Sequence, residues 1–163
     1  MALKIKLKPH ERLIVGGAVL ANGDTKCDLI IENEVPVLRD KDILREKDAD
    51  TPCKRIYFVV QLMYIDDKNR VERHNIYWSL IKDLVEAAPS TAETLAEMSS
   101  LIIEGKYYPA LKLARKLIEY EEEVTQYVRR AQCLQEDRED DHLGAGARSV
   151  GTDERRHAVE GVP

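Results

Sequence analysis

The sequence predicts an α+β protein, with a small antiparallel β module at the N-terminus, about four helices after it and a disordered C-terminal tail. Apolar and polar residues alternate from residue 3 to about residue 38, which is typical of strands with one buried face. Further along the chain, apolar residues recur at steps of three and four, which is typical of helices that pack on a core. We place the β module at residues 1–48, the helical region at 49–135 and the acidic tail at 136–163.

The expected β module contains five short strands joined by tight turns. LKIKL (3–7) alternates apolar residues with lysine, so one face of this strand should be buried while the other carries ammonium groups. Gly16 and Gly17 supply the positive backbone angles of a hairpin, and NGD (22–24) is a second hairpin signal. The other strands of the predicted meander are RLIV (12–15), AVLAN (18–22), KCDLIIE (26–32) and VPVL (35–38). A module of this size buries little surface alone, so we expect it to pack on the helical region.

The first helix is expected between residues 51 and 65. Thr51 followed by Pro52 is typical of an N-cap with proline at the first helical position. The segment that ends at Ile65 is apolar on nearly every face, which indicates a buried helix. A strand over IYFVV (56–60) stays open as an alternative.

Three more helices are expected before the tail. VERHNIYWSLIKDLVEAA (71–88) carries one apolar stripe and stops before Pro89. Ser90 and Glu93 have the spacing of a capping box, which predicts a third helix that closes at Gly105. The last helix has a seam at alternating steps of three and four residues, formed by Ala110, Leu113, Leu117, Tyr120, Val124, Tyr127, Ala131 and Leu134.

This seam has two interpretations. It can pack against the other helices of the chain, as in a helical bundle. It can also extend past the bundle and offer a partner-binding face to another helix, formed by Leu117, Tyr120, Val124, Tyr127 and Leu134. The two interpretations can hold over different stretches of the same helix.

Composition and motifs exclude several function classes. The four histidines are scattered, and Cys27, Cys53 and Cys133 lack the spacing of a zinc site, so we expect reduced structural thiols and no metal. The sequence contains no phosphate loop, dinucleotide fingerprint or nucleophile motif, so we expect neither enzymatic activity nor a cofactor. The N-terminal residues contain no apolar run that fits a signal peptide or a membrane helix, so we expect a cytoplasmic protein without membrane contact.

Basic residues gather at the front of a chain whose net charge is −5. An acidic balance argues against coating nucleic acid by bulk electrostatics, but a local site for a polyanion is compatible with it. There is a simpler interpretation of these residues. Lysines on the outer face of a strand also protect sheet edges from aggregation, and RDKD (39–42) has the composition of a solvated turn. The residues alone favour this simpler interpretation over a polyanion site. The candidate RNA-binding residues are Lys4, Lys6, Lys8, Arg12, Arg39 and Lys41.

Four stretches of the chain closely resemble the FlbT family of flagellum biosynthesis repressors, over roughly residues 1–125. They are MALKIKLKPHERLIVGGAVLANG (1–23), IIENEVPVLRDKDIL (30–44), TPCKRIYFVVQLMYI (51–65) and YYPALKLARKLIEYEEE (107–123). The resemblance implies a post-transcriptional regulator that associates with the 5′ untranslated region of flagellin mRNA and promotes its decay, although some members of the family act positively.

A second resemblance concerns the β module alone. LKIKLKPHERLIVG (3–16) and PVLRDKDIL (36–44) are similar to the first and last strands of the carbon storage regulator family of mRNA-binding proteins. In that family, basic residues of the first strand and an arginine after the last strand hold a single-stranded GGA-containing loop. The resemblance implies these roles for Lys6, Lys8 and Arg39, with Arg39 as the residue that reads sequence. The chain departs from that family in having lysine where arginine is usual, and in its helical region.

These observations lead to one hypothesis and one alternative. The hypothesis is an RNA-binding repressor of flagellum biogenesis, whose three cations are brought together if the first strand pairs with the strand that ends at Leu38. The alternative is an interaction protein that binds flagellin or another flagellar regulatory protein through the seam and acts on the message indirectly. Under either interpretation, a homodimer is an open expectation.

Overall fold

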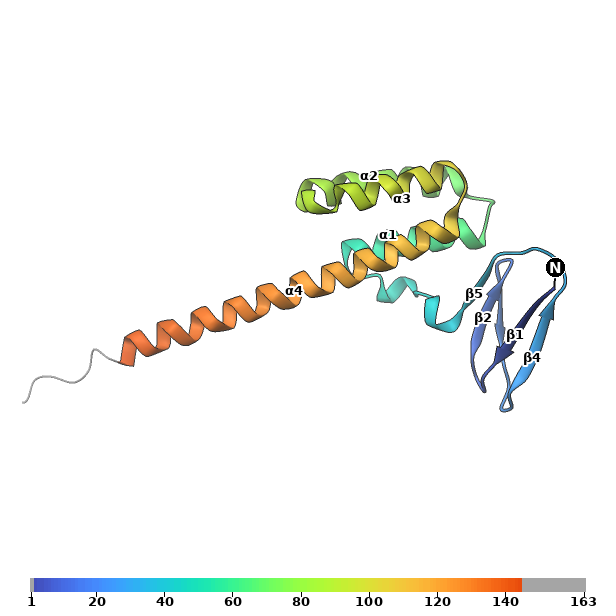
Figure 1. Cartoon of the computed structure of the whole chain (residues 1–163), viewed down its shortest axis with the longest axis horizontal. Helices are drawn as coiled ribbons and strands as arrows, with labels where there is room; N and C mark the ends of the chain where they lie inside the picture. The colour runs from blue at the N-terminus through green and yellow to red at the C-terminus, as the bar shows by residue number, and fades with distance from the viewer. Residues whose placement is uncertain (1, 145–163) are drawn as a thin grey trace, which may run out of the picture. The chain divides into compact units, whose positions relative to one another are not determined.

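The computed structural model describes residues 2–144, with side chains as far as residue 133, and it has the expected α+β order (Figure 1). The described residues up to Glu122 form one compact unit, and a second unit begins at Glu123. The boundary predicted after residue 48 therefore lies inside the first unit. The last helix runs to Gly144, past the end predicted at residue 135, and the rest of the predicted tail, residues 145–163, lies outside the described residues.

The β module consists of two small antiparallel sheets. Its strands are β1 (Leu3–Leu7), β2 (Arg12–Val15), β3 (Ala18–Ala21), β4 (Cys27–Ile31) and β5 (Val37–Arg39). Strand β1 pairs with β4, while β2 lies between β3 and β5. The predicted meander order and the predicted pairing of β1 with the strand ending at Leu38 are therefore wrong. Alternation shows which face of a strand is buried, but it does not show which strand lies beside it.

Two apolar surfaces explain this arrangement of strands. Ile5, Leu7, Leu13 and Ile31 form a small core inside the β module. The next residue of β2, Ile14, points the other way and belongs to the core of the helical region together with Leu38 of β5. The module thus packs on the helices, as expected from its size.

The hairpin at Gly16 and Gly17 is confirmed. Both glycines have positive φ angles, 54° and 85°, and they join the paired strands β2 and β3. The φ of Gly17 favours glycine at this position, where a Cβ atom would lie at contact distance, 3.4 Å, from the carbonyl oxygen of Ile65.

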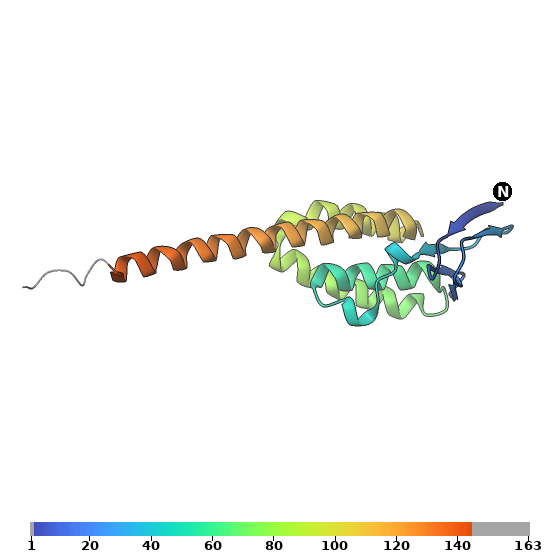
Figure 2. The ribbon, with the colours of Figure 1, turned by 90° about the horizontal axis from the view of Figure 1, so that it is seen from below.

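The four helices are α1 (Pro52–Ile65), α2 (Arg70–Ala87), α3 (Ala92–Ile103) and α4 (Tyr107–Gly144), and short 3₁₀ turns span Asp40–Asp42, Glu46–Asp48 and Pro89–Thr91. Helices α1 and α2 lie side by side (Figure 2). The hydroxyl of Thr51 accepts a hydrogen bond from the Lys54 backbone N–H at 3.3 Å, which confirms the N-cap of α1. IYFVV lies inside this helix, so the strand alternative is wrong.

The predicted capping box before α3 is wrong. Pro89 opens a 3₁₀ turn, and α3 begins at Ala92 with Thr91 as the residue before it. The hydroxyl of Ser90 instead forms a hydrogen bond with the Tyr120 hydroxyl at 2.9 Å. The predicted end is confirmed, because Gly105 has a φ of 75° and its N–H donates to the carbonyl of Ile102 at 3.0 Å.

The seam of α4 divides into a buried and an exposed stretch. Ala110 and Leu117 are buried in the helical core, and Leu113 is partly buried against it. Leu117 therefore cannot belong to the predicted partner-binding face. Tyr120, Val124 and Tyr127 are exposed, and the side chain of Leu134 lies outside the described residues.

Gln61 of α1 is a buried polar side chain that holds the segment after the β module. It is 2% exposed, accepts from the Leu44 backbone N–H at 2.8 Å and donates to the Leu44 carbonyl at 2.9 Å. Gln61→Leu would leave both backbone groups unpaired, so we expect a loss of about 2–4 kcal/mol in the free energy of unfolding, measured by urea denaturation. Gln126→Leu, at an exposed position of α4, should change it by less than about 0.5 kcal/mol. Equal effects of the two substitutions would contradict this role.

The three free thiols should differ in reactivity. Cys53 is buried, and burial raises its pKa to about 12, whereas Cys27 and Cys133 are exposed. In the native protein at pH 8 we expect Cys27 and Cys133 to react with a thiol reagent, and Cys53 to react only after denaturation. Mass spectrometry of labelled peptides would measure this. Rapid labelling of Cys53 in the native state would show that α1 is less protected than its packing indicates.

Candidate nucleic-acid interface

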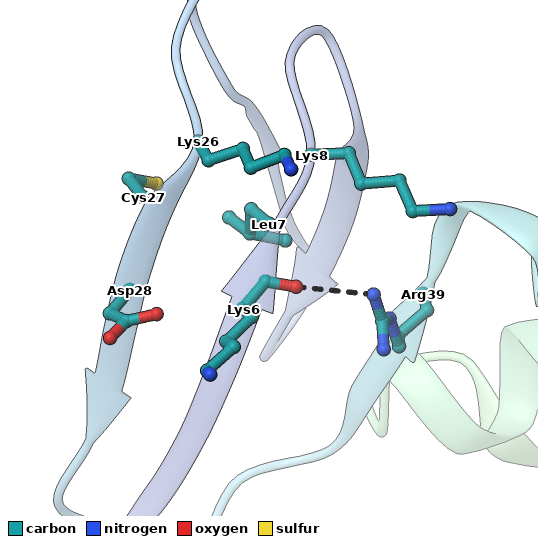
Figure 3. Close-up of a pocket in the computed structure, with 7 residues that line it drawn as sticks. All are labelled: Lys6, Leu7, Lys8, Lys26, Cys27, Asp28 and Arg39. Atoms are coloured by element: carbon teal, nitrogen blue, oxygen red, sulfur yellow. Dashed lines mark hydrogen bonds between the residues drawn. The ribbon is translucent and has the colours of Figure 1, made fainter.

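A depression of about 740 Å³ lies where β1 ends, where β4 begins and where β5 ends. Figure 3 shows the side chains around it, with the backbone oxygen of Lys6 facing Arg39. Its lining residues are Lys6, Leu7, Lys8, Lys26, Cys27, Asp28 and Arg39. Four of these seven side chains are cationic and one is acidic, so the depression is locally basic.

A second depression of about 530 Å³ adjoins the first, because both are lined by Lys8 and Arg39. Its other lining residues are Pro9, His10, Glu11, Asp40 and Lys41. We call the five cations of the two depressions, Lys6, Lys8, Lys26, Arg39 and Lys41, the basic rim. Three of the candidate RNA-binding residues, Lys6, Lys8 and Arg39, line the first depression, and Lys41 lines the second.

The strand pairing that brings these cations together differs from the predicted one. In the β1–β4 register Lys6 lies opposite Asp28, so Lys26 comes close to the end of β1. Strand β5 pairs with β2, yet its last residue still reaches β1, because Nη2 of Arg39 donates to the Lys6 carbonyl oxygen at 3.3 Å.

Glu11 fixes the position of the Arg39 side chain. Nη2 and Nε of Arg39 donate to Oε1 of Glu11 at 2.7 Å and 3.2 Å, and the Lys8 backbone N–H donates to Oε2 of Glu11 at 2.8 Å. The Glu11 side chain is only 13% exposed. The hydrogen bond from the Lys8 backbone, followed by that from Arg39, lowers the pKa of Glu11 below its ordinary value. Arg39 therefore has a structural role in addition to the predicted contact with RNA.

Lys41 is positioned by the helical region. Nη2 of Arg115, on α4, donates to the Lys41 carbonyl at 3.3 Å and to the Asp42 carboxylate at 3.0 Å. The Tyr57 hydroxyl, on α1, donates to the Asp42 carbonyl at 2.6 Å. The 3₁₀ turn that follows Arg39 is therefore attached to two helices.

The other two candidate residues are not part of the basic rim. The ammonium group of Lys4 lies 2.7 Å from the Asp28 carboxylate, and Lys4 lines neither depression. Arg12 is exposed on β2 and also lines neither. By strand alternation, its side chain lies on the face of β2 opposite to that of Leu13, whose side chain is in the core of the β module.

Sequence reasoning missed Lys26 and Glu11. Lys26 is a single lysine before CDLII (27–31), and only the pairing of β1 with β4 relates it to Lys6. Glu11 lies among N-terminal cations, but its contact with Arg39 spans 28 positions of sequence. The one available signal was its place in the turn after β1, where a carboxylate often accepts backbone N–H groups.

The basic rim is suited to binding phosphate groups, because lysine and arginine side chains from separate segments line the two adjoining depressions. Within the part of the chain that the structure describes, no three His, Cys, Asp or Glu side chains form a potential metal site. In that same part, no helix has the length and apolar character needed to cross a membrane.

The Glu11–Arg39 ion pair should make the thermal stability of the fold depend on pH in acid. A lowered pKa in the folded state means that the ionised carboxylate stabilises the fold. This contribution is complete above about pH 4.5, the ordinary value, and is lost as the pH falls through the lowered pKa. We expect the melting temperature to fall on acidification below pH 4.5, and to fall less in Glu11→Gln. Glu34→Gln, which removes an exposed carboxylate of the same module, should keep the wild-type profile. Identical acid profiles for Glu11→Gln and wild type would disprove the contribution.

Comparison with known proteins identifies the family. Residues 3–125 match the model of a family described as flagellar protein FlbT. Over 125 residues, the chain is 47% identical to the probable flagellum biosynthesis repressor protein FlbT 1 of Bradyrhizobium diazoefficiens, covering 76% of this chain and 85% of that one. It is 36% identical to the flagellum biosynthesis repressor protein FlbT of Caulobacter vibrioides, covering 76% and 89%. No solved structure matches, and the similarity to the carbon storage regulator family stays a prediction. The chain belongs to the FlbT family of flagellar proteins.

Proposed function

We propose that this protein represses flagellum biosynthesis by binding the 5′ untranslated region of flagellin mRNA through the basic rim and promoting degradation of the message. The names of its relatives support the repressor role. The presence of Lys6, Lys8, Lys26 and Arg39 around one depression is the observation that supports the RNA-binding part.

Charge distribution supports a local site for RNA. The chain has a net charge of −5, so a polyanion is repelled by the molecule at long range. Within about one Debye length of the rim, roughly 8 Å at physiological salt, the local cations dominate. Such a site binds few phosphates at once, and the affinity for RNA falls as salt rises.

The size and chemistry of the rim favour single-stranded RNA, such as a loop in the message leader. Proteins that recognise a specific RNA sequence usually bind unpaired bases, which stack on aromatic side chains and on the guanidinium planes of arginine. His10 brings an imidazole ring to the second depression, in a turn where its φ angle is 60°. Arg39 brings the guanidinium group, whose position the Glu11 carboxylate fixes before RNA binds.

The proposed activity is binding, without a chemical step by this protein. A protein that holds the leader of a message changes its accessibility to ribosomes and nucleases, and cellular nucleases then perform the cleavage. The proposal therefore requires no metal, cofactor or catalytic residue in this chain.

A titration of fluorescent flagellin leader RNA tests the site. We expect Lys6→Ala, Lys8→Ala and Lys26→Ala together to weaken binding and to reduce the slope of log K against log salt. Because each phosphate contact to a single strand contributes about 0.7 to that slope, the loss should be about 2. Fluorescence anisotropy at four salt concentrations measures both quantities.

The matched control is Lys82→Ala, Lys106→Ala and Lys116→Ala, which removes the same charge from exposed positions on or next to the helices. Its slope should equal that of the wild type. Equal slopes for the two triple variants would move the site away from the basic rim. Failure of the wild-type protein, purified free of nucleic acid, to bind the leader would disprove direct RNA contact.

A further inference from the structure

The stretch of α4 after Glu122 carries an apolar stripe that faces solvent. Val124, Tyr127 and Val128 are 42%, 74% and 45% exposed, and Ala131 is exposed beside them. Their spacing of three, four and seven residues places them along one face of the helix. Water in contact with such a stripe is unfavourable, and a second helix with a complementary stripe would remove it.

The charged residues beside this stripe indicate which helix can pair with it and in which orientation. With Val124 and Ala131 at heptad positions a and Tyr127 at position d, Glu123 and Arg130 occupy successive g positions at the edge of the stripe. In an antiparallel pair of identical helices, g positions face g positions. Glu123 of each copy then lies opposite Arg130 of the other, so one pairing is made twice around a two-fold axis.

Side-chain size favours the same orientation. In the antiparallel register, Val124 of each copy packs against Tyr127 of the other, which combines a small and a large side chain in each layer. A parallel pair would place Tyr127 against Tyr127. It would also place Glu123 beside Val128, where the carboxylate has no opposite charge across the interface.

We propose that a second copy of this chain docks antiparallel along α4, with the two-fold axis between Thr125 and Gln126. The two pairs of Glu123 with Arg130 set the register, and the layers of Val124 with Tyr127 supply the apolar contact. Because the contact is short, the dimer is expected to dissociate in the micromolar range. The proposal concerns residues outside the basic rim, so it can fail without affecting the proposed RNA site.

Charge reversal in the full-length protein tests the register. Glu123→Arg places like charges opposite each other twice, so we expect the dissociation constant of the dimer to rise at least about tenfold in sedimentation equilibrium. Glu123→Arg combined with Arg130→Glu exchanges the two charges and should restore the constant to within about threefold of wild type. The matched control is Glu122→Arg, at the neighbouring position that faces away from the stripe, which should also stay within about threefold.

Cysteine pairing tests the orientation. In a background of Cys27→Ser and Cys133→Ser, the Val124→Cys and Tyr127→Cys proteins should form a disulfide dimer when mixed and oxidised. Each protein alone should remain uncrosslinked, because the antiparallel register pairs position 124 with position 127. Crosslinking of each variant alone would show a parallel pair and overturn the proposal.

Two results in solution would also overturn it. One is a wild-type protein that remains monomeric up to roughly 100 µM. The other is a dimer that Glu123→Arg and Glu122→Arg weaken equally, since the effect would then come from the total charge of the helix and not from the pairing of Glu123 with Arg130. Circular dichroism of each variant, with unchanged helix content, shows that a loss of association is not a loss of the helix.

Discussion

Helix α1 presents apolar side chains in almost every direction, so several other segments must exclude water from it. Helix α2 packs along one side, and the other helices contribute to the same core. Strands β2 and β5 contribute Ile14 and Leu38, and the Tyr64 hydroxyl accepts from the Val37 N–H at 3.2 Å. The β module therefore packs against the helices, because this contact removes apolar side chains of α1, β2 and β5 from water.

Local chemistry predicted the elements of this fold better than their pairing. Thr51 and Pro52 indicated where α1 begins, and Gly105 indicated where α3 ends, because each signal acts within one turn of the chain. Strand pairing depends on contacts between distant segments, and alternation in LKIKL is equally compatible with β4 or β5 as a neighbour. The capping box failed for a related reason, since the tertiary contact of Ser90 with Tyr120 replaced the local one.

The sequence indicated some residues of the candidate site, but the strand pairing on which that prediction relied is wrong. Lys6, Lys8 and Arg39 come together, although β1 and β5 are not paired, because the two sheets of the module face each other across its small core. Lys4 and Arg12 have the same chemistry but different positions in the fold, which composition cannot distinguish. The positions of Lys26 and Glu11 in the site depend on contacts between residues that are far apart in the sequence. A pattern confined to one strand therefore did not reveal them.

The attachment of the 3₁₀ turn Asp40–Asp42 to Tyr57 and Arg115 limits how this protein can be divided. A fusion that carried only the first 48 residues would keep every lysine of the rim but would lose the side chains from α1 and α4 that hold the turn carrying Lys41. The smallest portable unit for engineering is therefore the whole of Met1–Glu122. Recombination between relatives would preserve the attachment of this turn only if residues 42, 57 and 115 were inherited together.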